Sequence, residues 1–340
     1  QDRAMLGPRH ILLVLLLNIY LCCGATGNKM NGDAGAIDRR WDALMTNCKG
    51  CWSGSICWLD FQEENETDTF KITPRAENNK QNMRLAFSPR PSNAEIADWV
   101  VYHARALHER QEVTLYRQKE DDPMKGQKGP EQTFYCFGGG NLGRSGLKFG
   151  ELPVIEHGYW DTEEGMRRTV VLAYDAVSGY ISKVCFLQQK KQAEKEEDTF
   201  DVAAICLDHI SVMPTRAQTL KKLKLSWKKN KGNVKEEILD CTKKDQYMDV
   251  HKTDTCNDSI GKLLGVGINE QVEHSIDDNV VRIALPNGVV IACPYYFKTG
   301  KDYEVIMGYR KKCGEIQMTE FAFDKKAKLQ KVTARWIQKD

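Results

Sequence analysis

Three polar side chains in this chain of 340 residues could move a proton to or from a bound molecule: His103, His157 and Tyr159. An imidazole titrates near neutral pH, so either histidine could act as a general base. His157 lies in a glycine-containing connection just before Tyr159. The alternative for each histidine is an ordinary surface or boundary position, because the sequence has no HExxH motif and no histidine pair four residues apart.

Seven tryptophans could line a binding pocket, because indole rings stack on aromatic and apolar molecules. We take Trp52, Trp58 and Trp160 as the candidate ligand-binding residues. Trp52 and Trp58 are separated by an even number of positions in one strand-like segment, which predicts that they face the same side. The alternative is that the tryptophans fill protein cores.

Several short motifs resemble known sites but lack the necessary context. Residues 138–143 match GxGxxG, yet strand-like sequence lies on both sides, whereas a dinucleotide site needs a helix after the motif. Cys48, Cys51 and Cys57 have no fourth ligand at a spacing that suits zinc. No GxSxG or Walker-type motif is present. We assign no metal site and identify no cofactor. Scattered carboxylates could still bind a divalent cation without a recognisable motif.

The charge balance gives no support to nucleic-acid binding. The 49 Lys and Arg residues against 47 Asp and Glu give a net charge of +2, so the chain has no global basic field. The lysine-rich run 221–231 alternates with leucines, which favours a solvated strand face over a nucleic-acid patch. With 41% hydrophobic and 28% charged residues, the composition is globular.

The N-terminal residues predict a secreted, extracellular protein. Basic residues precede the apolar run Ile11 to Leu21, and small residues follow it, which is typical of a signal peptide. No later stretch is long enough for a membrane span. Sequons at Asn65 and Asn257 would be usable for glycosylation during export. The cysteines that follow the expected signal peptide are candidates for disulfides, and their spacing does not determine which of them pair. These cysteines are Cys48, Cys51, Cys57, Cys136, Cys185, Cys206, Cys241, Cys256, Cys293 and Cys313.

Alternation of apolar and polar residues predicts many short strands. It is clear in residues 223–228 and 332–336, and an Asn-Gly turn between alternating segments predicts a hairpin over 280–293. A capping box followed by apolar residues at helical spacing predicts a helix over 92–107, and a weaker pattern predicts one over 203–210. Such a chain is expected to be mainly β and antiparallel.

The two halves of the chain look related, which favours a duplicated β unit. Ala173-Tyr174-Asp175 in the first half and Ala322-Phe323-Asp324 in the second each begin a strand–turn–strand pattern, and the polar stretch 188–198 separates the halves. We expect a signal peptide at 1–25, a disordered leader at 26–40, a first β-barrel domain at 41–190, a linker at 191–199 and a second β-barrel domain at 200–340.

Two segments carry a resemblance to a known family. Trp41-Asp42-Ala43-Leu44 with residues 50–55, and residues 285–294 running on to Met307-Gly308-Tyr309, resemble the tandem lipocalin-like (calycin) proteins of cyanobacteria and algae. The resemblance implies two antiparallel calycin-like β-barrels in tandem with a few short helices. A barrel of ~8 strands is wide enough for one small ligand.

The segment from Trp41 to Trp58, in a secreted cysteine-bearing chain without a conventional enzyme motif, also resembles the luciferases of syllid fireworms. This resemblance implies a bioluminescent, cofactor-independent oxidoreductase of the monooxygenase type that oxidises a bound aromatic substrate, with dioxygen as co-substrate. The alternative is a non-catalytic lipocalin-like carrier or sequestering protein for a small hydrophobic ligand. A secreted protein-binding module is a third hypothesis.

Overall fold

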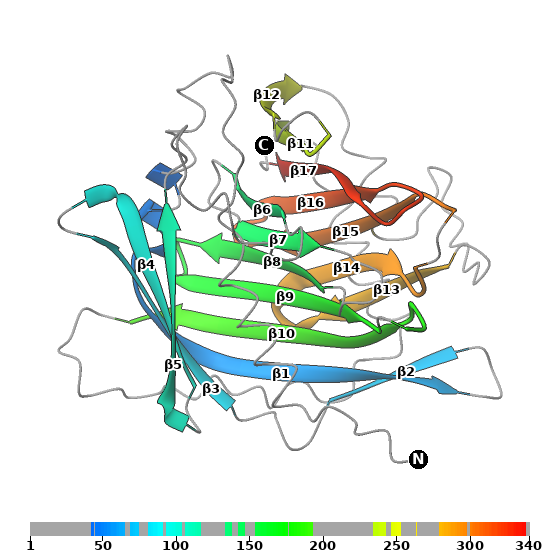
Figure 1. Cartoon of the computed structure of the whole chain (residues 1–340), viewed down its shortest axis with the longest axis horizontal. Coiled ribbons are helices and arrows are strands. Elements are labelled where there is room, and N and C mark those ends of the chain that lie inside the picture. The colour runs from blue at the N-terminus through cyan, green and yellow to red at the C-terminus, as the bar shows by residue number, and fades with distance from the viewer. Residues whose placement is uncertain are drawn as a thin grey trace.

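The part of the chain that the structure describes is almost entirely β (Figure 1). Helix is limited there to positions within 42–48, to Leu263 and to the 3-10 turn Pro286–Gly288, and no helix among the described residues is long and apolar enough to cross a membrane. The mainly β class with few short helices is therefore confirmed. The computed structural model describes residues 42–43, 45–64, 69–74, 81–90, 93–103, 106–116, 133–137, 142–146, 154–175, 177–192, 234–242, 246–252, 263, 279–297 and 300–337.

The first sheet contains ten antiparallel strands, and the long strand β1 lies near its middle. Its order is β5-β4-β3-β1-β10-β9-β8-β7-β6, with β2 paired to the end of β1. Strands β5 and β6 do not pair with each other within the described residues, so this part of the sheet has two open edges. The strands are β1 (Gly50–Glu64), β2 (Thr69–Pro74), β3 (Gln81–Arg90), β4 (Asn93–His103), β5 (Ala106–Tyr116), β6 (Thr133–Cys136), β7 (Leu142–Gly146), β8 (Val154–Asp161), β9 (Met166–Tyr174) and β10 (Ile181–Lys191).

The second sheet contains seven antiparallel strands in the order β12-β11-β17-β16-β15-β14-β13. The two sheets share one feature of topology, because in each the first described strand pairs with the last described strand: β1 with β10 and β11 with β17. Two antiparallel sheets in tandem are thus confirmed. The strands are β11 (Val234–Asp240), β12 (Gln246–Lys252), β13 (Val280–Leu285), β14 (Val289–Pro294), β15 (Tyr303–Arg310), β16 (Ile316–Phe323) and β17 (Leu329–Ile337).

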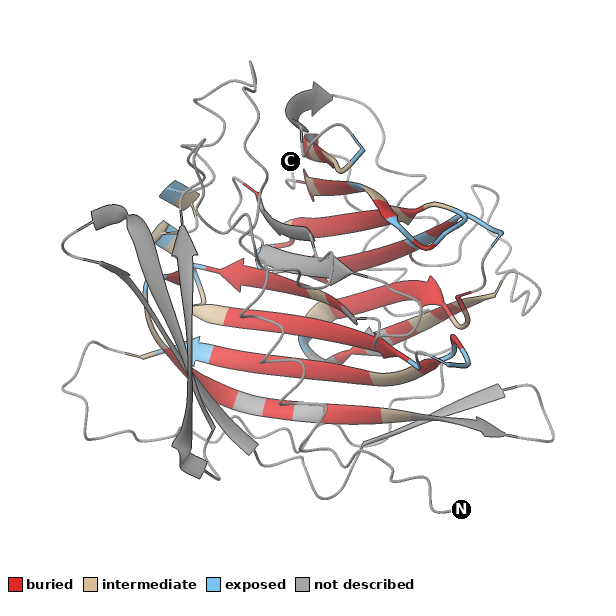
Figure 2. Ribbon diagram, in the orientation of Figure 1, coloured by how far each residue is buried: buried red, intermediate tan, exposed pale blue. Residues whose placement is uncertain are grey.

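The two sheets pack against each other around a shared hydrophobic core. Rings meet across this interface: Tyr159 lies 5.6 Å from Tyr309 between centroids, and Tyr174 lies 4.6 Å from Phe297. Figure 2 shows the central strands of both sheets buried along most of their length. The second sheet covers one face of β8–β10. Side chains that point to the opposite face of these strands therefore do not contact the second sheet.

The predicted hairpin at 280–293 is confirmed. Strands β13 and β14 pair in register from Val280 opposite Pro294 to Leu285 opposite Val289. Asn287 and Gly288 have φ angles of 60° and 81°, the left-handed region that asparagine and glycine adopt at low cost. The expected strand at 332–336 is also present, within β17.

The hairpins β9–β10 and β16–β17 close with related turns. The Asp175 carboxylate accepts hydrogen bonds from the N–H groups of the residues two and three positions later, at 3.0 and 2.7 Å. The Asp324 carboxylate accepts from those two and four positions later, both at 2.9 Å. Each turn then contains a left-handed residue, Gly179 or Ala327. These equivalent turns agree with the repeat expected from the two Tyr/Phe-Asp segments.

The helix predicted over 92–107 is wrong, because these residues form β4 and the beginning of β5. Strand β4 pairs along its length with β3 and β5, and its run of aromatic and β-branched residues suits a pleated sheet. The polar stretch 188–198 also begins as strand, because β10 continues to Lys191 with Gln189 fully buried. The segments 1–40, 203–210 and 223–228 lie outside the described residues.

Candidate functional site

Strand alternation divides the predicted site residues between two faces of the first sheet. In β8, His157 and Tyr159 point toward the second sheet, where Tyr159 joins the shared core. Trp160, the next residue, points to the opposite face and packs with Arg167. The structure therefore places two of the predicted proton-transfer groups, His157 and Tyr159, on the face opposite to that of the predicted ligand-binding indole Trp160.

The opposite face gathers all three candidate tryptophans. Trp52 lies opposite Lys191 and Trp58 opposite Cys185 in the β1–β10 pairing, and continuation through β9 places Trp160 on the same side. Their exposed fractions are 1%, 4% and 3%. The expectation that Trp52 and Trp58 face one side is confirmed. We call this surface the tryptophan face and define it by Trp52, Trp58, Trp160, Arg167, Thr169 and Gln189.

The buried guanidinium of Arg167 lies on the same face as these indoles. Sequence analysis did not identify this residue. Arg167 in β9 donates from Nη1 to the Gln189 side-chain oxygen at 3.0 Å, and its Cζ atom lies 4.9 Å from the Trp160 ring centroid. Burial lowers the pKa of Arg167, while the charges of Glu156 and Cys48 oppose that shift. The cation is held by aromatic stacking and by an amide rather than by bulk water.

Three further polar atoms are buried on the tryptophan face. Trp160 Nε1, Thr169 Oγ1 and Gln189 Nε2 have no hydrogen-bond partner within the described part of the chain. Gly158 has no side chain, which allows the Trp160 ring and the Thr169 hydroxyl to lie close to its backbone. A Cβ atom at Gly158 would lie 3.0 Å from the Trp160 ring and 3.2 Å from the Thr169 hydroxyl. The face therefore combines apolar rings with a compact group of donors.

His157 and Tyr159 form a neutral aromatic contact inside the inter-sheet core. Their ring centroids are 4.5 Å apart, and His157 Nε2 lies 2.8 Å from the Thr319 hydroxyl oxygen. Complete burial lowers the pKa of His157 to about 3. Burial raises the pKa of Tyr159. Both groups are uncharged at neutral pH. The second-sheet side chains Thr319 and Tyr309 pack beside them.

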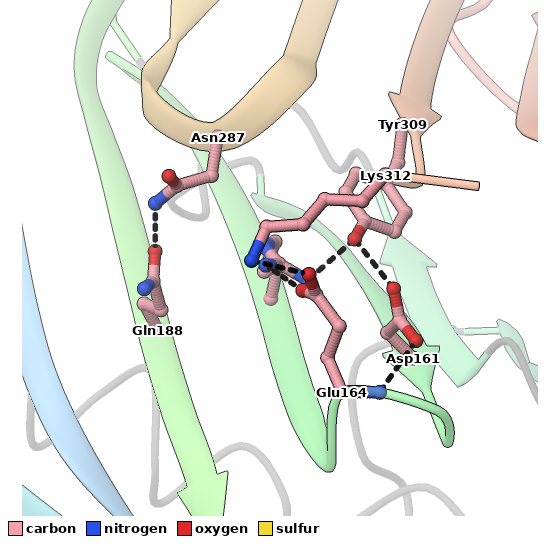
Figure 3. Close-up of polar contacts among 7 residues, drawn as sticks. Asp161, Glu164, Gln188, Asn287, Tyr309 and Lys312 are labelled. Atoms are coloured by element: carbon pink, nitrogen blue, oxygen red, sulfur yellow. Dashed lines mark hydrogen bonds and ion pairs between the residues drawn. The ribbon is translucent and has the colours of Figure 1, made fainter. Parts of the chain in front are cut away.

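A second polar cluster joins the two sheets beyond these residues (Figure 3). The Tyr309 hydroxyl accepts a hydrogen bond from Arg168 at 2.6 Å and donates to the Asp161 carboxylate at 2.9 Å. Glu164 bridges Arg168 and Lys312, with N···O distances of 2.8 Å to each. No local pattern indicates this cluster, because its first-sheet members, in β8, β9 and the turn between them, meet Tyr309 of β15 across 141 and 148 positions of the chain.

The other predicted positions divide between described and undescribed residues. His103 is the last residue of β4, and its side chain lies outside the description, as do Asn65 and Asn257. Six cysteines have described side chains, and each is a thiol rather than part of a disulfide, so the disulfide prediction is not confirmed for them: Cys48, Cys51, Cys185, Cys241, Cys293 and Cys313. The side chains of the other four candidates, Cys57, Cys136, Cys206 and Cys256, are not described.

The environment of two of these thiols explains why they do not pair with each other. Cys185 lies opposite Trp58 on the tryptophan face, whereas Cys293 belongs to the inter-sheet core. A disulfide needs Cβ atoms within ~4.5 Å and pointing toward each other. Within the same described residues, no group of three His, Cys, Asp or Glu side chains is arranged to hold a metal ion.

Comparison with known proteins finds similarity at the level of fold. No family model matches the chain, and no curated protein matches it. The chain is similar to the crystal structure of a DUF3598-family protein of unknown function from Nostoc punctiforme, with a TM-score of 0.50 and 10% identity over 88% of this chain and 99% of that one. An S-type phycobiliprotein lyase from Guillardia theta gives a TM-score of 0.26 and 9% identity over 47% of this chain and 94% of the lyase.

Proposed function

We propose that this protein binds a small aromatic or apolar molecule on the tryptophan face of its first sheet, as a carrier or sequestering protein rather than as a catalyst. The observation that carries the proposal is the placement of Trp52, Trp58 and Trp160 on one buried face, where the Arg167 guanidinium stacks on Trp160. Ligand pockets combine such apolar walls with a few fixed polar groups. The antiparallel β architecture and the calycin-like resemblance of the sequence agree with this proposal.

The distribution of candidate bases favours binding over light-emitting oxidation. A general base must come within hydrogen-bond reach of the proton that it removes, directly or through one water molecule. His157 and Tyr159 lie on the other side of the sheet, against Thr319 and Tyr309. A substrate stacked on Trp160 would therefore be separated from both by the backbone of β8.

Binding can be tested with N-phenyl-1-naphthylamine, a neutral aromatic probe, by exciting tryptophan and recording probe emission. We expect saturable binding to the folded protein. Trp160→Leu should weaken it about 5- to 10-fold, since loss of an aromatic contact costs ~1–1.4 kcal/mol. Trp336→Leu is the matched control, because Trp336 belongs to the inter-sheet core. Circular dichroism should show that both variants are folded. Absence of saturable binding, or equal weakening by both variants, would contradict the proposal.

We also propose that the protein is exported and loses residues 1–25. The apolar run Ile11 to Leu21 and the small residues after it support this. Expression in cultured secretory cells should yield protein in the medium whose N-terminal sequence begins close to residue 26. Intracellular protein that retains the N-terminal segment would refute export.

A further inference from the structure

We infer that the tryptophan face recognises an anionic oxygen group, such as a carboxylate or sulfonate, on the molecule that it binds. This inference rests on the proposed binding function and names the ligand's polar end. The observations behind it are a buried cation and three buried polar atoms, all on the same face as the tryptophans. They come from three neighbouring strands, β8, β9 and β10.

The chemistry of the polar atoms calls for an acceptor. The indole N–H of Trp160 can only donate a hydrogen bond. The Gln189 side-chain oxygen already accepts from Arg167, so its amide nitrogen presents donors. The Thr169 hydroxyl can donate as well. Within the described residues these three atoms find no partner, and buried polar groups are normally hydrogen-bonded.

The register of the strands places these donors within reach of one small group. Trp160 lies directly opposite Arg167, and Arg167 lies directly opposite Gln189. Side chains opposite each other in adjacent antiparallel strands are ~5 Å apart at Cβ. Thr169 is the next residue of β9 on the same face, opposite Gly158. Because Gly158 lacks a side chain, the Trp160 ring lies close to Thr169.

The charge of Arg167 selects an anion over a neutral acceptor. Hydrogen bonds in which both partners are ionised are roughly twice as strong as neutral ones. Glu156 shares this electrostatic environment with Cys48, and Lys191 lies on the same face with its ammonium 5.7 Å from the Trp52 ring. The Lys191 ammonium therefore adds a second positive charge on the face that holds Arg167.

A matched pair of probes tests the inference. 8-Anilino-1-naphthalenesulfonate and N-phenyl-1-naphthylamine share one aromatic skeleton, and only the first carries a sulfonate. We expect the sulfonate to bind about 10-fold more tightly, as one charge-assisted contact would give. Arg167→Met and Gln189→Leu should each bring the ratio of the two affinities close to 1, whatever effect either variant has on binding of the neutral probe itself. Lys190→Met is the control for the loss of one positive charge, because Lys190 is exposed on the other face of β10.

Each outcome separates the inference from the proposed function. Equal binding of both probes overturns anion recognition and leaves ligand binding intact, whereas no binding of either probe overturns both. A sulfonate preference that survives Arg167→Met also overturns the inference. If circular dichroism shows that Arg167→Met is unfolded, Trp160→Phe keeps an aromatic ring but removes the indole donor. It should then lower the ratio of sulfonate affinity to neutral-probe affinity ~3-fold or more.

Discussion

Acidification from pH 7 to pH 5 should destabilise the folded protein through His157. This imidazole is fully buried in the inter-sheet core beside Thr319 and Phe321. Its pKa falls from 6.5 to about 3 because burial penalises the charged form. In the unfolded chain the same side chain takes up a proton near pH 6.5. Below that pH the unfolded state binds more protons than the folded state, so the free energy of unfolding decreases as the pH falls.

The size of the His157 effect follows from the two pKa values. At pH 5 the unfolded imidazole is almost fully protonated and the folded one almost fully neutral, which corresponds to a loss of about 2 kcal/mol relative to pH 7. Glu164 and Asp175 have lowered pKa values, so the stability they contribute is present above their ordinary values, near 4, and is lost only at lower pH. Their titration therefore lies below the window in which His157 acts.

Urea unfolding at pH 7, 6 and 5, followed by circular dichroism, measures this effect. His157→Gln is the informative variant, because glutamine can hydrogen-bond to Thr319 but does not titrate. Its free energy of unfolding should change less between pH 7 and pH 5 than that of the natural chain, by about 2 kcal/mol. The reasoning would be refuted by an equal pH dependence of the two proteins, which would mean that His157 is protonated in the folded state or that it is not buried.

Three other substitutions or treatments have defined outcomes. Tyr309→Phe removes the hydroxyl that bridges a buried guanidinium and a buried carboxylate, and should lower the free energy of unfolding by about 2–4 kcal/mol; a cost near zero in urea titrations would exclude the bridge. Gly158→Ala places a methyl group 3.0 Å from the Trp160 ring, and should weaken N-phenyl-1-naphthylamine binding. An unchanged affinity would mean that the Trp160 ring does not contact the probe. Iodoacetamide should modify exposed Cys313 rapidly in the folded protein and leave Cys293 unmodified, because burial raises the pKa of Cys293 to about 12. Peptide mass spectrometry reads both sites, and a Cys313 disulfide in the purified protein would contradict the structure.

The β class and several hairpins could be predicted because their signals are local. Alternation within β17 and the Asn-Gly turn before β14 each depend on fewer than about ten neighbouring residues. The failure at 92–107 has the opposite origin. Apolar residues there occur at helical spacing, but the strand β4 is stabilised by pairing with β3 on one side and β5 on the other. Such tertiary pairing overrides a local helical pattern and leaves no trace within the segment itself.

The candidate site was predictable in part. Even spacing predicted that Trp52 and Trp58 share a face, and the strand register places Trp160 on that face as well. The partners that define that face could not be found, because pairing brings Arg167 and Gln189 together across 22 positions of the chain. For His157, the decisive neighbour is Thr319, 162 positions away. Burial and the resulting pKa shift are properties of this long-range contact and have no counterpart in the local sequence.

Strand β8 contributes to the inter-sheet core on one face and to the proposed binding face on the other. Its odd-numbered residues His157 and Tyr159 stabilise the packing of one sheet on the other, whereas Gly158 and Trp160 belong to the opposite face. A change at either set should therefore act on one property. Protonation of His157 weakens the inter-sheet core without adding charge to the tryptophan face, and loss of the Trp160 indole removes a ligand contact without placing a charge in that core. The alternation of a single strand is sufficient to explain why the proton-transfer and aromatic candidates, adjacent in the sequence, cannot form one catalytic site.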